Sequence, residues 1–396
     1  MAHAWLLLCA SASALVAPVT RRATTPLQAS TARDVLWTPD ADYVKTTAMD
    51  RFQKAMQIDG TYEQLWDWSV SEPDAFWTRL QDFLDVEREG SDTPARTGDT
   101  MPDVQWFPQS KLNFAENLLR HGKGPLANDE AVITVSEGMG RKAWTFAELR
   151  RDAGRVQRAL SKLGVDSSES CGAYVANVGE AVVAMLGATA TGATWTSCSP
   201  DFGAAAVADR FGQVSPKVLF TCDAFMSAGK ETALVDKVEE LVAALPSLER
   251  VVVVGMSAEG KAAVWKDARL KGLVVSWDDF LAEGSEAGGA APPPSYAKVP
   301  FAHPQFVLYS SGTTGRPKSI AHGAGNTLLQ HAKEHVLHGE LREGDRMLFY
   351  TTCGWMMWNW MVSSLFAGAA IVCFDGFAAH PKLSAPPTAT PTPTPS

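Results

Sequence analysis

The sequence has few of the features that mark several classes of protein. Its six cysteines lie apart in apolar stretches without C-x-x-C spacing, which argues against a disulfide framework and a zinc site. The net charge of -9 and the absence of a basic run argue against nucleic-acid binding. No apolar run is long enough to span a membrane as a helix. The remaining composition, 46% hydrophobic and 20% charged, is typical of a globular protein. With nucleic acid disfavoured, we expect a small-molecule substrate.

Acidic residues are also absent from the first 33 positions. A short apolar run at Trp5–Val16 is followed by a segment rich in Thr, Ala and Arg at Val19–Arg33. This order resembles a signal peptide followed by a transit peptide, as in plastid leaders of algae with complex plastids. We therefore expect residues 1–33 to be a targeting leader for an organelle, and the resemblance implies the plastid. The alternative is a cytoplasmic protein with an unstructured N-terminus.

The most informative stretch is a loop rich in glycine and hydroxyl side chains. The apolar run Gln305–Tyr309 has strand character and leads directly into this loop, after which we expect a helix. Glycine and hydroxyl groups bring hydrogen-bond donors close to an anion, and a lysine adds positive charge. The spacing G-x-x-G-x-P-K differs from the Walker pattern. The loop predicts a phosphate site at Ser310, Ser311, Gly312, Thr313, Thr314, Gly315 and Lys318.

Strand and helix patterns alternate through the middle of the chain. We expect a hairpin at residues 131–144, and then alternating strands and helices from 171 to 277. Thr145 and Glu148 have the spacing of a capping box that opens a helix. The predicted strands are 171–175, 193–196, 217–221, 251–254 and 273–277, and the predicted helices are 146–163, 180–190, 204–213 and 231–244. This alternation predicts an α/β fold with a mostly parallel sheet covered by helices, and ligands at the carboxyl ends of the strands.

The helix after the loop contains the pattern H-x-x-E-H at His331, Glu334 and His335. This pattern is nominally the inverted zinc-protease signature, with both imidazoles on one helix face. The interpretation that we favour is a solvated helix face, because Lys333 and Glu334 are charged. We assign no metal ligand.

A second apolar motif, TTCGWMMWNW, follows a predicted strand at Arg346–Thr351. Aromatic and methionine side chains at this density are most often part of a core, and a helix over Met356–Phe366 would bury them. They also follow a strand end, where a small acyl group needs an apolar wall. Trp355, Met356 and Met357 are the candidates for that wall.

The phosphate loop closely resembles the signature loop of the adenylate-forming, AMP-binding superfamily. The resemblance implies that Thr313, Thr314, Gly315 and Lys318 hold the phosphates of ATP, with Mg²⁺ and coenzyme A as further participants. YEQLWDWSVSEPDAFWTRL from Tyr62, SCSPDFG from Ser197 and GWMMWNW from Gly354 resemble the acetyl-CoA and acetoacetyl-CoA synthetase branch.

The branch resemblance implies a ligase for a short carboxylic acid. It implies that the Met-rich motif forms the acyl pocket and that the Ser197 stretch lies near the coenzyme A entrance. A strand-to-helix loop is an equal interpretation of that stretch. The sequence of the Met-rich motif, GWMMWNW, resembles acetoacetyl-CoA synthetases more than acetyl-CoA synthetases, which favours acetoacetate as the acid. Acetate or propionate, and a non-catalytic nucleotide-binding protein, are the alternatives.

The resemblance covers residues 36–376 and then ends in a Pro/Thr-rich stretch. We find no Y-G-x-T-E motif, no Y-x-T-G-D motif and no adenylation lysine, so no catalytic residue is assigned. We interpret the sequence as a truncated relative and expect no ligase turnover from it. Oligomeric state is not assigned. The expected parts are a leader (1–33), a Trp-rich helical extension (34–122), an incomplete large N-terminal domain of the superfamily (123–376) and a disordered tail (377–396).

Overall fold

The computed structural model describes residues 36–137, 140–257, 270–286, 291, 293–310 and 315–379. The chain divides into two units, Met1–Lys45 and Thr46–Ser396. In the first unit, the described residues 36–45 contain helix α1 (Ala41–Lys45). The predicted leader lies outside the described residues, as does the predicted tail beyond residue 379. All elements from α2 onward belong to the second unit.

A seven-stranded sheet forms the larger layer of the second unit, in the order β13-β12-β9-β7-β8-β15-β16. Neighbouring strands are parallel except for the last pair, β15 and β16, which form an antiparallel hairpin. The mostly parallel sheet is therefore confirmed. Its strands are β7 (Ser170–Tyr174), β8 (Thr194–Cys198), β9 (Val218–Cys222), β12 (Arg250–Val254), β13 (Val274–Ser276), β15 (Pro304–Ser310) and β16 (Lys318–Gly323).

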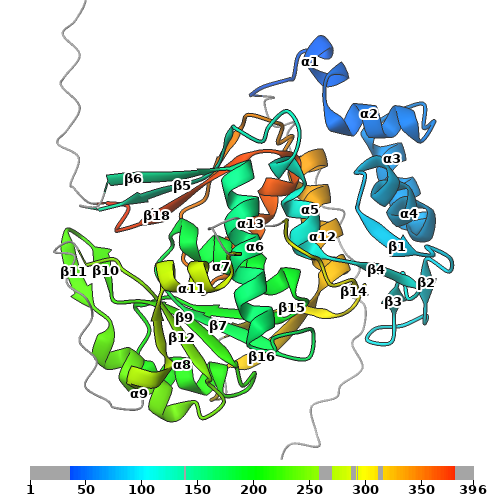
Figure 1. The fold of residues 1–396 in the computed structure, drawn as a ribbon. Helices are drawn as coiled ribbons and strands as arrows, with labels where there is room; N and C mark the ends of the chain where they lie inside the picture. The colour runs from blue at the N-terminus through cyan, green and yellow to red at the C-terminus, as the bar shows by residue number, and fades with distance from the viewer. Residues whose placement is uncertain are drawn as a thin grey trace, which may run out of the picture. The chain divides into compact units, whose positions relative to one another are not determined.

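A second sheet has four strands in the order β17-β18-β5-β6. Its strands are β17 (Arg346–Leu348), β18 (Ala370–Asp375), β5 (Glu130–Ser136) and β6 (Gly140–Thr145). β5 and β6 form the predicted antiparallel hairpin, and β17, β18 and β5 are parallel. The two sheets are drawn one above the other in Figure 1, with α6 and α7 between them.

Helix α6 (Phe146–Lys162) opens with the predicted capping box. The amide nitrogen of Thr145 donates to Glu148 Oε2 at 2.9 Å, and the amide nitrogen of Glu148 donates to Thr145 Oγ1 at 3.2 Å. Helix α7 (Gly179–Ala190) packs along α6, and all twelve of its residues are buried. A helix that is apolar on every side requires cover on every side, which α6 and the two sheets supply.

At Gly187, helix α7 approaches α6 closely. A Cβ atom at this position would lie 2.4 Å from Val156 Cγ1 and 3.0 Å from the carbonyl oxygen of Ala153. We expect Gly187→Ala to lower the free energy of unfolding by about 2 kcal/mol, because the helices must separate to admit the methyl group. Gly272→Ala, in open space within α10 (Leu270–Leu273), should be neutral or stabilising. Equal denaturant midpoints for the two variants would contradict the close approach.

Helices cover both faces of the large sheet. α8 (Ala204–Phe211) and α9 (Val235–Ala244) lie on one face, and α11 (Trp277–Glu283) packs with α6 on the other (Figure 1). The chain leaves β7 toward β8 on one side and returns through α8 to β9 on the other side of β7. Connections thus change direction beside β7. In parallel sheets, ligands bind outside the carboxyl ends of the strands at such a point.

The predicted Trp-rich helices near the N-terminus are present as α2 (Ala48–Ala55), α3 (Tyr62–Ser71) and α4 (Pro73–Phe83). The ring of Phe52 lies at their centre, with its centroid 5.9 Å from that of Phe76 and 5.1 Å from that of Phe83. Short strands next to these helices in the sequence form two small sheets. In one sheet β4 pairs with β1 and with β14 from later in the chain, and in the other β2 pairs with β3. They are β1 (Arg88–Gly90), β2 (Arg96–Thr97), β3 (Gln105–Trp106), β4 (Ser110–Leu112) and β14 (Val299–Pro300).

Three local predictions differ from the structure. The extension predicted to be helical also contains strand β4, in which Leu112 pairs with Arg88 and Val299, so the helix that follows is short, α5 (Phe114–Leu118) with η1 (Arg120–Gly122) after it. The helix expected from Glu231 begins at Val235, after a hairpin of β10 (Ala224–Ser227) and β11 (Lys230–Ala233). The loop after Tyr309 leads into strand β16 rather than directly into a helix.

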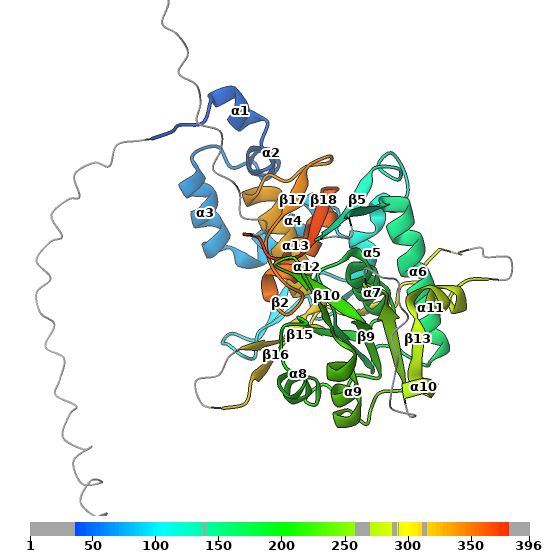
Figure 2. The ribbon, with the colours of Figure 1, turned by 90° about the vertical axis from the view of Figure 1, so that its left-hand side faces the viewer.

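The last elements fold back beside the β15–β16 hairpin. They are α12 (Ala324–Lys333), the π-helical turn η2 (Glu334–His338), α13 (Met356–Ser363) and η3 (Ser364–Ala367). Figure 2 shows α12 and α13 between the four-stranded sheet and the β15–β16 hairpin. Within the part of the chain that the structure describes, no helix has the length and apolar character needed to cross a membrane.

Candidate functional site

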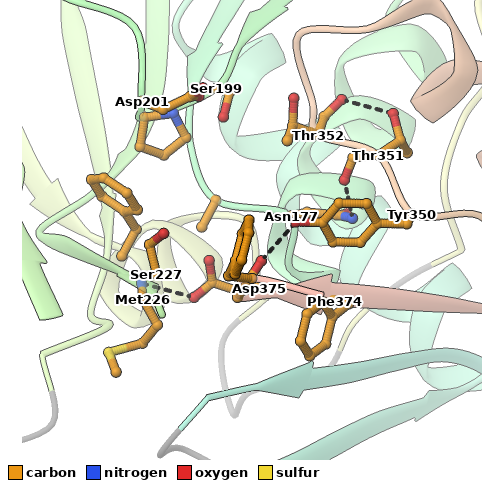
Figure 3. A pocket seen from close by; sticks show the side chains of 15 residues that line it. Asn177, Ser199, Asp201, Met226, Ser227, Tyr350, Thr351, Thr352, Phe374 and Asp375 are labelled. Carbon is orange, nitrogen blue, oxygen red and sulfur yellow. Dashed lines mark hydrogen bonds between the residues drawn. The ribbon is translucent and has the colours of Figure 1, made fainter. Parts of the chain in front are cut away.

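A pocket of about 200 Å³, here called the strand-end pocket, lies where the large sheet changes direction (Figure 3). The segments after β7, β8 and β9 contribute Asn177, Ser199 with Asp201, and Met226 with Ser227. The smaller sheet contributes its own strand ends, with residues 350–352 after β17 and residues 374–377 at β18. Carboxyl ends from both sheets therefore meet at one pocket, where the α/β pattern predicted a ligand site.

Asn177 joins the strand-end pocket to helix α13. Its Nδ2 donates to the carbonyl oxygen of Thr351 at 3.2 Å, and its Oδ1 accepts from Trp358 Nε1 at 2.9 Å. Nearby, Ser197 Oγ donates to the carbonyl oxygen of Cys353 at 2.6 Å. The segment that carries the Met-rich motif is therefore held against the ends of β7 and β8.

Asp375 ends β18 and is buried at the strand-end pocket. Its Oδ2 accepts from Ser136 Oγ at 2.9 Å and from the amide nitrogen of Met226 at 3.3 Å. Burial raises the pKa of the Asp375 carboxyl above its ordinary value, although both hydrogen bonds act in the opposite direction. Aromatic rings of Phe225, Tyr350 and Phe374 line the same pocket, so it suits a flat ring with polar substituents.

A second cavity of about 360 Å³, here called the α12–α13 cavity, lies between these helices and the hairpin. Met356 and Met357, two of the predicted acyl-pocket residues, line it together with Phe306 and Leu308 of β15. Trp355 caps the start of α13 with its side chain 63% exposed and does not line this cavity. Trp358, by contrast, is fully buried, so the motif supplies both a cavity wall and a part of the core.

The predicted phosphate loop connects β15 to β16. Ser311, Gly312, Thr313 and Thr314 are outside the described residues. The ends of the loop are described: Ser310 pairs with Lys318 across the hairpin, and Gly315 has a φ of 126°, which favours glycine. The carbonyl oxygen of Pro317 accepts from Gln213 Nε2 at 3.0 Å, which holds the loop against the segment after α8.

Lys318 and His322 lie on the same face of β16, because side chains alternate along a strand. His322 lines the α12–α13 cavity. Four residues of strand place Lys318 roughly 13 Å further along that face. The predicted phosphate-binding lysine and the predicted acyl wall therefore both lie along the β15–β16 hairpin, but Lys318 does not line the cavity.

The prediction of a solvated helix face at His331 and His335 is wrong. Both side chains are buried, because α12 and η2 pack against α13. His331 Nδ1 lies 2.8 Å from Ser363 Oγ, and His335 Nε2 lies 2.7 Å from the carbonyl oxygen of Trp360. Burial lowers the pKa of His331 to about 3, so this imidazole is neutral at pH 7. Among the described residues, no group of three His, Cys, Asp or Glu side chains could hold a metal ion.

The buried His331 makes stability depend on pH. Its folded-state pKa of about 3 lies below the ordinary value of 6.5, so its stabilising contribution is full above pH 6.5 and declines as pH falls toward 3. We expect the free energy of unfolding of His331→Asn to change less with pH between 4 and 6 than that of the parent chain. The difference in slope should be about 1.4 kcal/mol per pH unit. Denaturant titrations across this range measure it, and parallel profiles would contradict the assignment.

Comparisons with known proteins identify the family. The profile of AMP-binding enzymes matches residues 123–389, which is more than half of the chain. This chain belongs to the AMP-binding enzyme family. The profile of the acetyl-coenzyme A synthetase N-terminus matches residues 62–118, which include helices α3 and α4.

Acetoacetyl-CoA synthetases are among the similar proteins, which confirms the predicted branch. The protein of Rattus norvegicus is 42% identical over 352 residues, covering 86% of this chain and 51% of that protein. The protein of Rhizobium meliloti (strain 1021) is 39% identical over 347 residues, with the same two coverages. The solved structure from Streptomyces lividans matches with a TM-score of 0.80 at 39% identity, covering 87% of this chain and 52% of that one.

This structural match confirms the predicted fold class of the AMP-binding family. The chain spans about half the length of the curated relatives that it matches. Sequence patterns missed Asn177, Met226 and Asp375, which line the strand-end pocket. Each of these residues follows or ends a buried strand, which is the one signal that they share in the sequence. The sequence does not show how the two sheets are arranged, so it could not show that these strand ends lie at one pocket.

Proposed function

We propose that this chain provides the ATP-phosphate, acyl and coenzyme A sites of a ligase that forms acetoacetyl-CoA, AMP and pyrophosphate. The observation that carries the proposal is a single segment that joins two cavities, one of which is lined by the β15–β16 hairpin. Residues 351–360 run from the strand-end pocket to the α12–α13 cavity, and the cavity lies beside the β15–β16 phosphate hairpin. The 42% identity with an acetoacetyl-CoA synthetase supports the choice of substrate.

The first step of this reaction joins the acid to AMP. A carboxylate oxygen of acetoacetate attacks the α-phosphorus of ATP, and pyrophosphate leaves with the electrons of the broken P–O bond. Lys318 and the amides and hydroxyls of residues 310–315 would neutralise charge on the departing phosphates. Mg²⁺ would enter as the Mg-ATP complex. Positioning and charge neutralisation are the contributions that these residues can make.

The second step exchanges AMP for a thiol. The sulfur of coenzyme A attacks the acyl carbonyl carbon, its proton is lost to solvent, and AMP leaves. The strand-end pocket, with its aromatic walls, suits the flat adenine ring of coenzyme A. The acyl chain would lie against Met356 and Met357, and exposed Trp355 stands at the start of the same helix, where it could cover the acyl group.

Saturation-transfer NMR on the full chain tests this proposal without requiring turnover. We expect transfer to Mg-ATP, coenzyme A and acetoacetate, and weaker binding of AMP, which lacks the two phosphates assigned to Lys318. Transfer to ATP alone would favour a nucleotide-binding protein without ligase chemistry. Transfer to none of the three ligands would overturn the proposal.

The division at residues 33, 122 and 376, and a plastid leader, are proposals that rest on sequence alone. Expression of residues 1–33 fused to a fluorescent protein in an alga with complex plastids tests the leader. Fluorescence that stays in the cytoplasm would favour the alternative location.

A further inference from the structure

A third cavity, of about 300 Å³ and here called the aromatic cavity, lies beside helix α12. Helix α4 contributes Trp77 to its lining, strand β3 and the residue after it contribute Trp106 and Phe107, and Phe301 lies opposite α12 residues. The ring centroids of Trp77 and Trp106 are 6.2 Å apart, and those of Phe107 and Phe301 are 5.0 Å apart. None of the described residues that line the cavity is charged. The aromatic cavity therefore suits an uncharged alkyl or aryl group.

Gln330 is the residue that the aromatic cavity shares with the α12–α13 cavity, among the described residues that line the two. Asn326 and Leu329 line the aromatic cavity, whereas Thr327 and His331 line the α12–α13 cavity. Gln330 follows Asn326 by four residues and Thr327 by three, so the helix places it at the boundary between these two faces. Its half-buried side chain thus separates the cavity proposed for the acyl chain from a second apolar space.

Hydrogen bonds hold the Gln330 side chain in this position. Its Nε2 donates to Glu334 Oε1 at 2.7 Å, and Trp360 Nε1 donates to Glu334 Oε2 at 2.8 Å. Burial acts to raise the pKa of the Glu334 carboxyl, but these hydrogen bonds and the neighbouring charges lower it overall. The carboxylate is therefore ionised at pH 7, and both hydrogen bonds are charge-assisted. Moving Gln330 aside would break one of them.

The walls of the aromatic cavity are fixed in place by packing. Phe107 and Phe301 are 1% and 3% exposed. A Cβ atom at Gly325 would lie 2.3 Å from Phe301 Cδ2, so the Phe301 ring lies directly against the start of α12. A space with fixed walls accepts a ligand at little cost of reorganisation. Shortening the Gln330 side chain would therefore join two existing spaces.

We infer, resting on the proposed function, that Gln330 sets the upper length of the acid by closing the α12–α13 cavity toward the aromatic cavity. The chain of a short acid ends against Met356, Met357 and the Gln330 side chain. An acid with a longer alkyl or aryl group needs the space that Gln330 fills, so it is excluded. The aromatic cavity is an extension of the acyl site that this one side chain keeps closed.

Ligand-observed NMR titration of the full chain with butyrate and octanoate tests this role. Both acids are saturated and carry one carboxylate, so they differ in chain length alone. Gln330→Ala should bind octanoate about tenfold more tightly than the parent chain does, because the added methylene groups leave water for the aromatic cavity. Its affinity for butyrate should equal that of the parent chain. Acetoacetate should displace the bound octanoate.

Variants of a neighbouring residue serve as controls. Asn326→Ala shortens an exposed side chain that lines the aromatic cavity but not the α12–α13 cavity, so both acid affinities should equal those of the parent chain. Adding Asn326→Trp to Gln330→Ala fills the aromatic cavity and should abolish the gain in octanoate affinity. Gln330→Ser shortens the same side chain and should show the same gain, which covers the case of an unstable Gln330→Ala.

The outcomes separate this role from the proposed function. Equal octanoate affinities for the parent chain and for a folded variant with Ala or Ser at Gln330 would overturn the inference. A gain that persists after Asn326→Trp is added would overturn it as well, because octanoate then binds elsewhere. If the parent chain binds neither acetoacetate nor butyrate, the proposed function fails, and the inference fails with it.

Discussion

Lys318→Ala should weaken Mg-ATP binding by tenfold or more. The side chain is exposed at the start of β16, beside the loop that resembles a phosphate site, and its loss removes a charge-assisted contact worth about 1.5–3 kcal/mol. Binding of AMP should hardly change, because AMP lacks the β- and γ-phosphates. Calorimetry of the two nucleotides against parent and variant measures both effects.

The lysine prediction has two matched controls. Lys318→Arg keeps the charge and should retain part of the ATP affinity. Lys111→Ala removes an exposed strand lysine from β4, in a different sheet, and should leave ATP affinity unchanged. Equal ATP affinities for the parent chain and Lys318→Ala would remove the phosphate role, whatever the result for coenzyme A.

Asn177→Asp should lower the free energy of unfolding by about 3 kcal/mol at pH 7. The substitution preserves shape and the acceptor for Trp358 Nε1, but it replaces the donor to the carbonyl oxygen of Thr351 with a buried negative charge. Coenzyme A affinity should fall as well, since Asn177 lines the strand-end pocket. Denaturant titration measures the first effect and calorimetry the second.

The loss in free energy of unfolding caused by Asn177→Asp should become smaller as the pH is lowered. A buried carboxyl facing a carbonyl oxygen has a raised pKa, and once protonated it can donate to Thr351 again. The deficit should therefore be largest at pH 7 and smaller near pH 5. Asn128→Asp, at an exposed position, should remain within about 0.5 kcal/mol of the parent chain at both values. A loss in unfolding free energy that does not change with pH would contradict the role of Asn177 as a hydrogen-bond donor to Thr351.

The α/β layer was predictable because its strands are continuous apolar runs. Residues 171–175 and 251–254 lie close to the observed β7 and β12, and the capping box at Thr145 and Glu148 marked the start of α6 correctly. Strands β11 and β16 were not predictable in this way. Their residues are mostly exposed and polar, and their extended form comes from pairing with β10 and β15 rather than from burial.

The candidate site was predictable only where its residues are neighbours in the sequence. Local patterns predict a phosphate loop and an acyl wall, because the residues of each lie in one continuous segment. The strand-end pocket joins Asn177 to residues about 175 positions later, so no local pattern could reveal it. The burial of His331 and His335 depends on packing against α13, and the charged neighbours Lys333 and Glu334 indicated solvent instead.

A crystal structure of the chain with Mg-ATP and acetoacetate tests the central claim most directly. The account predicts triphosphate density against Lys318 and the loop at residues 310–315. It predicts the acid in the α12–α13 cavity, against Met356 and Met357. Acetoacetate bound elsewhere, or a triphosphate that does not approach Lys318, would contradict the assignment of these sites.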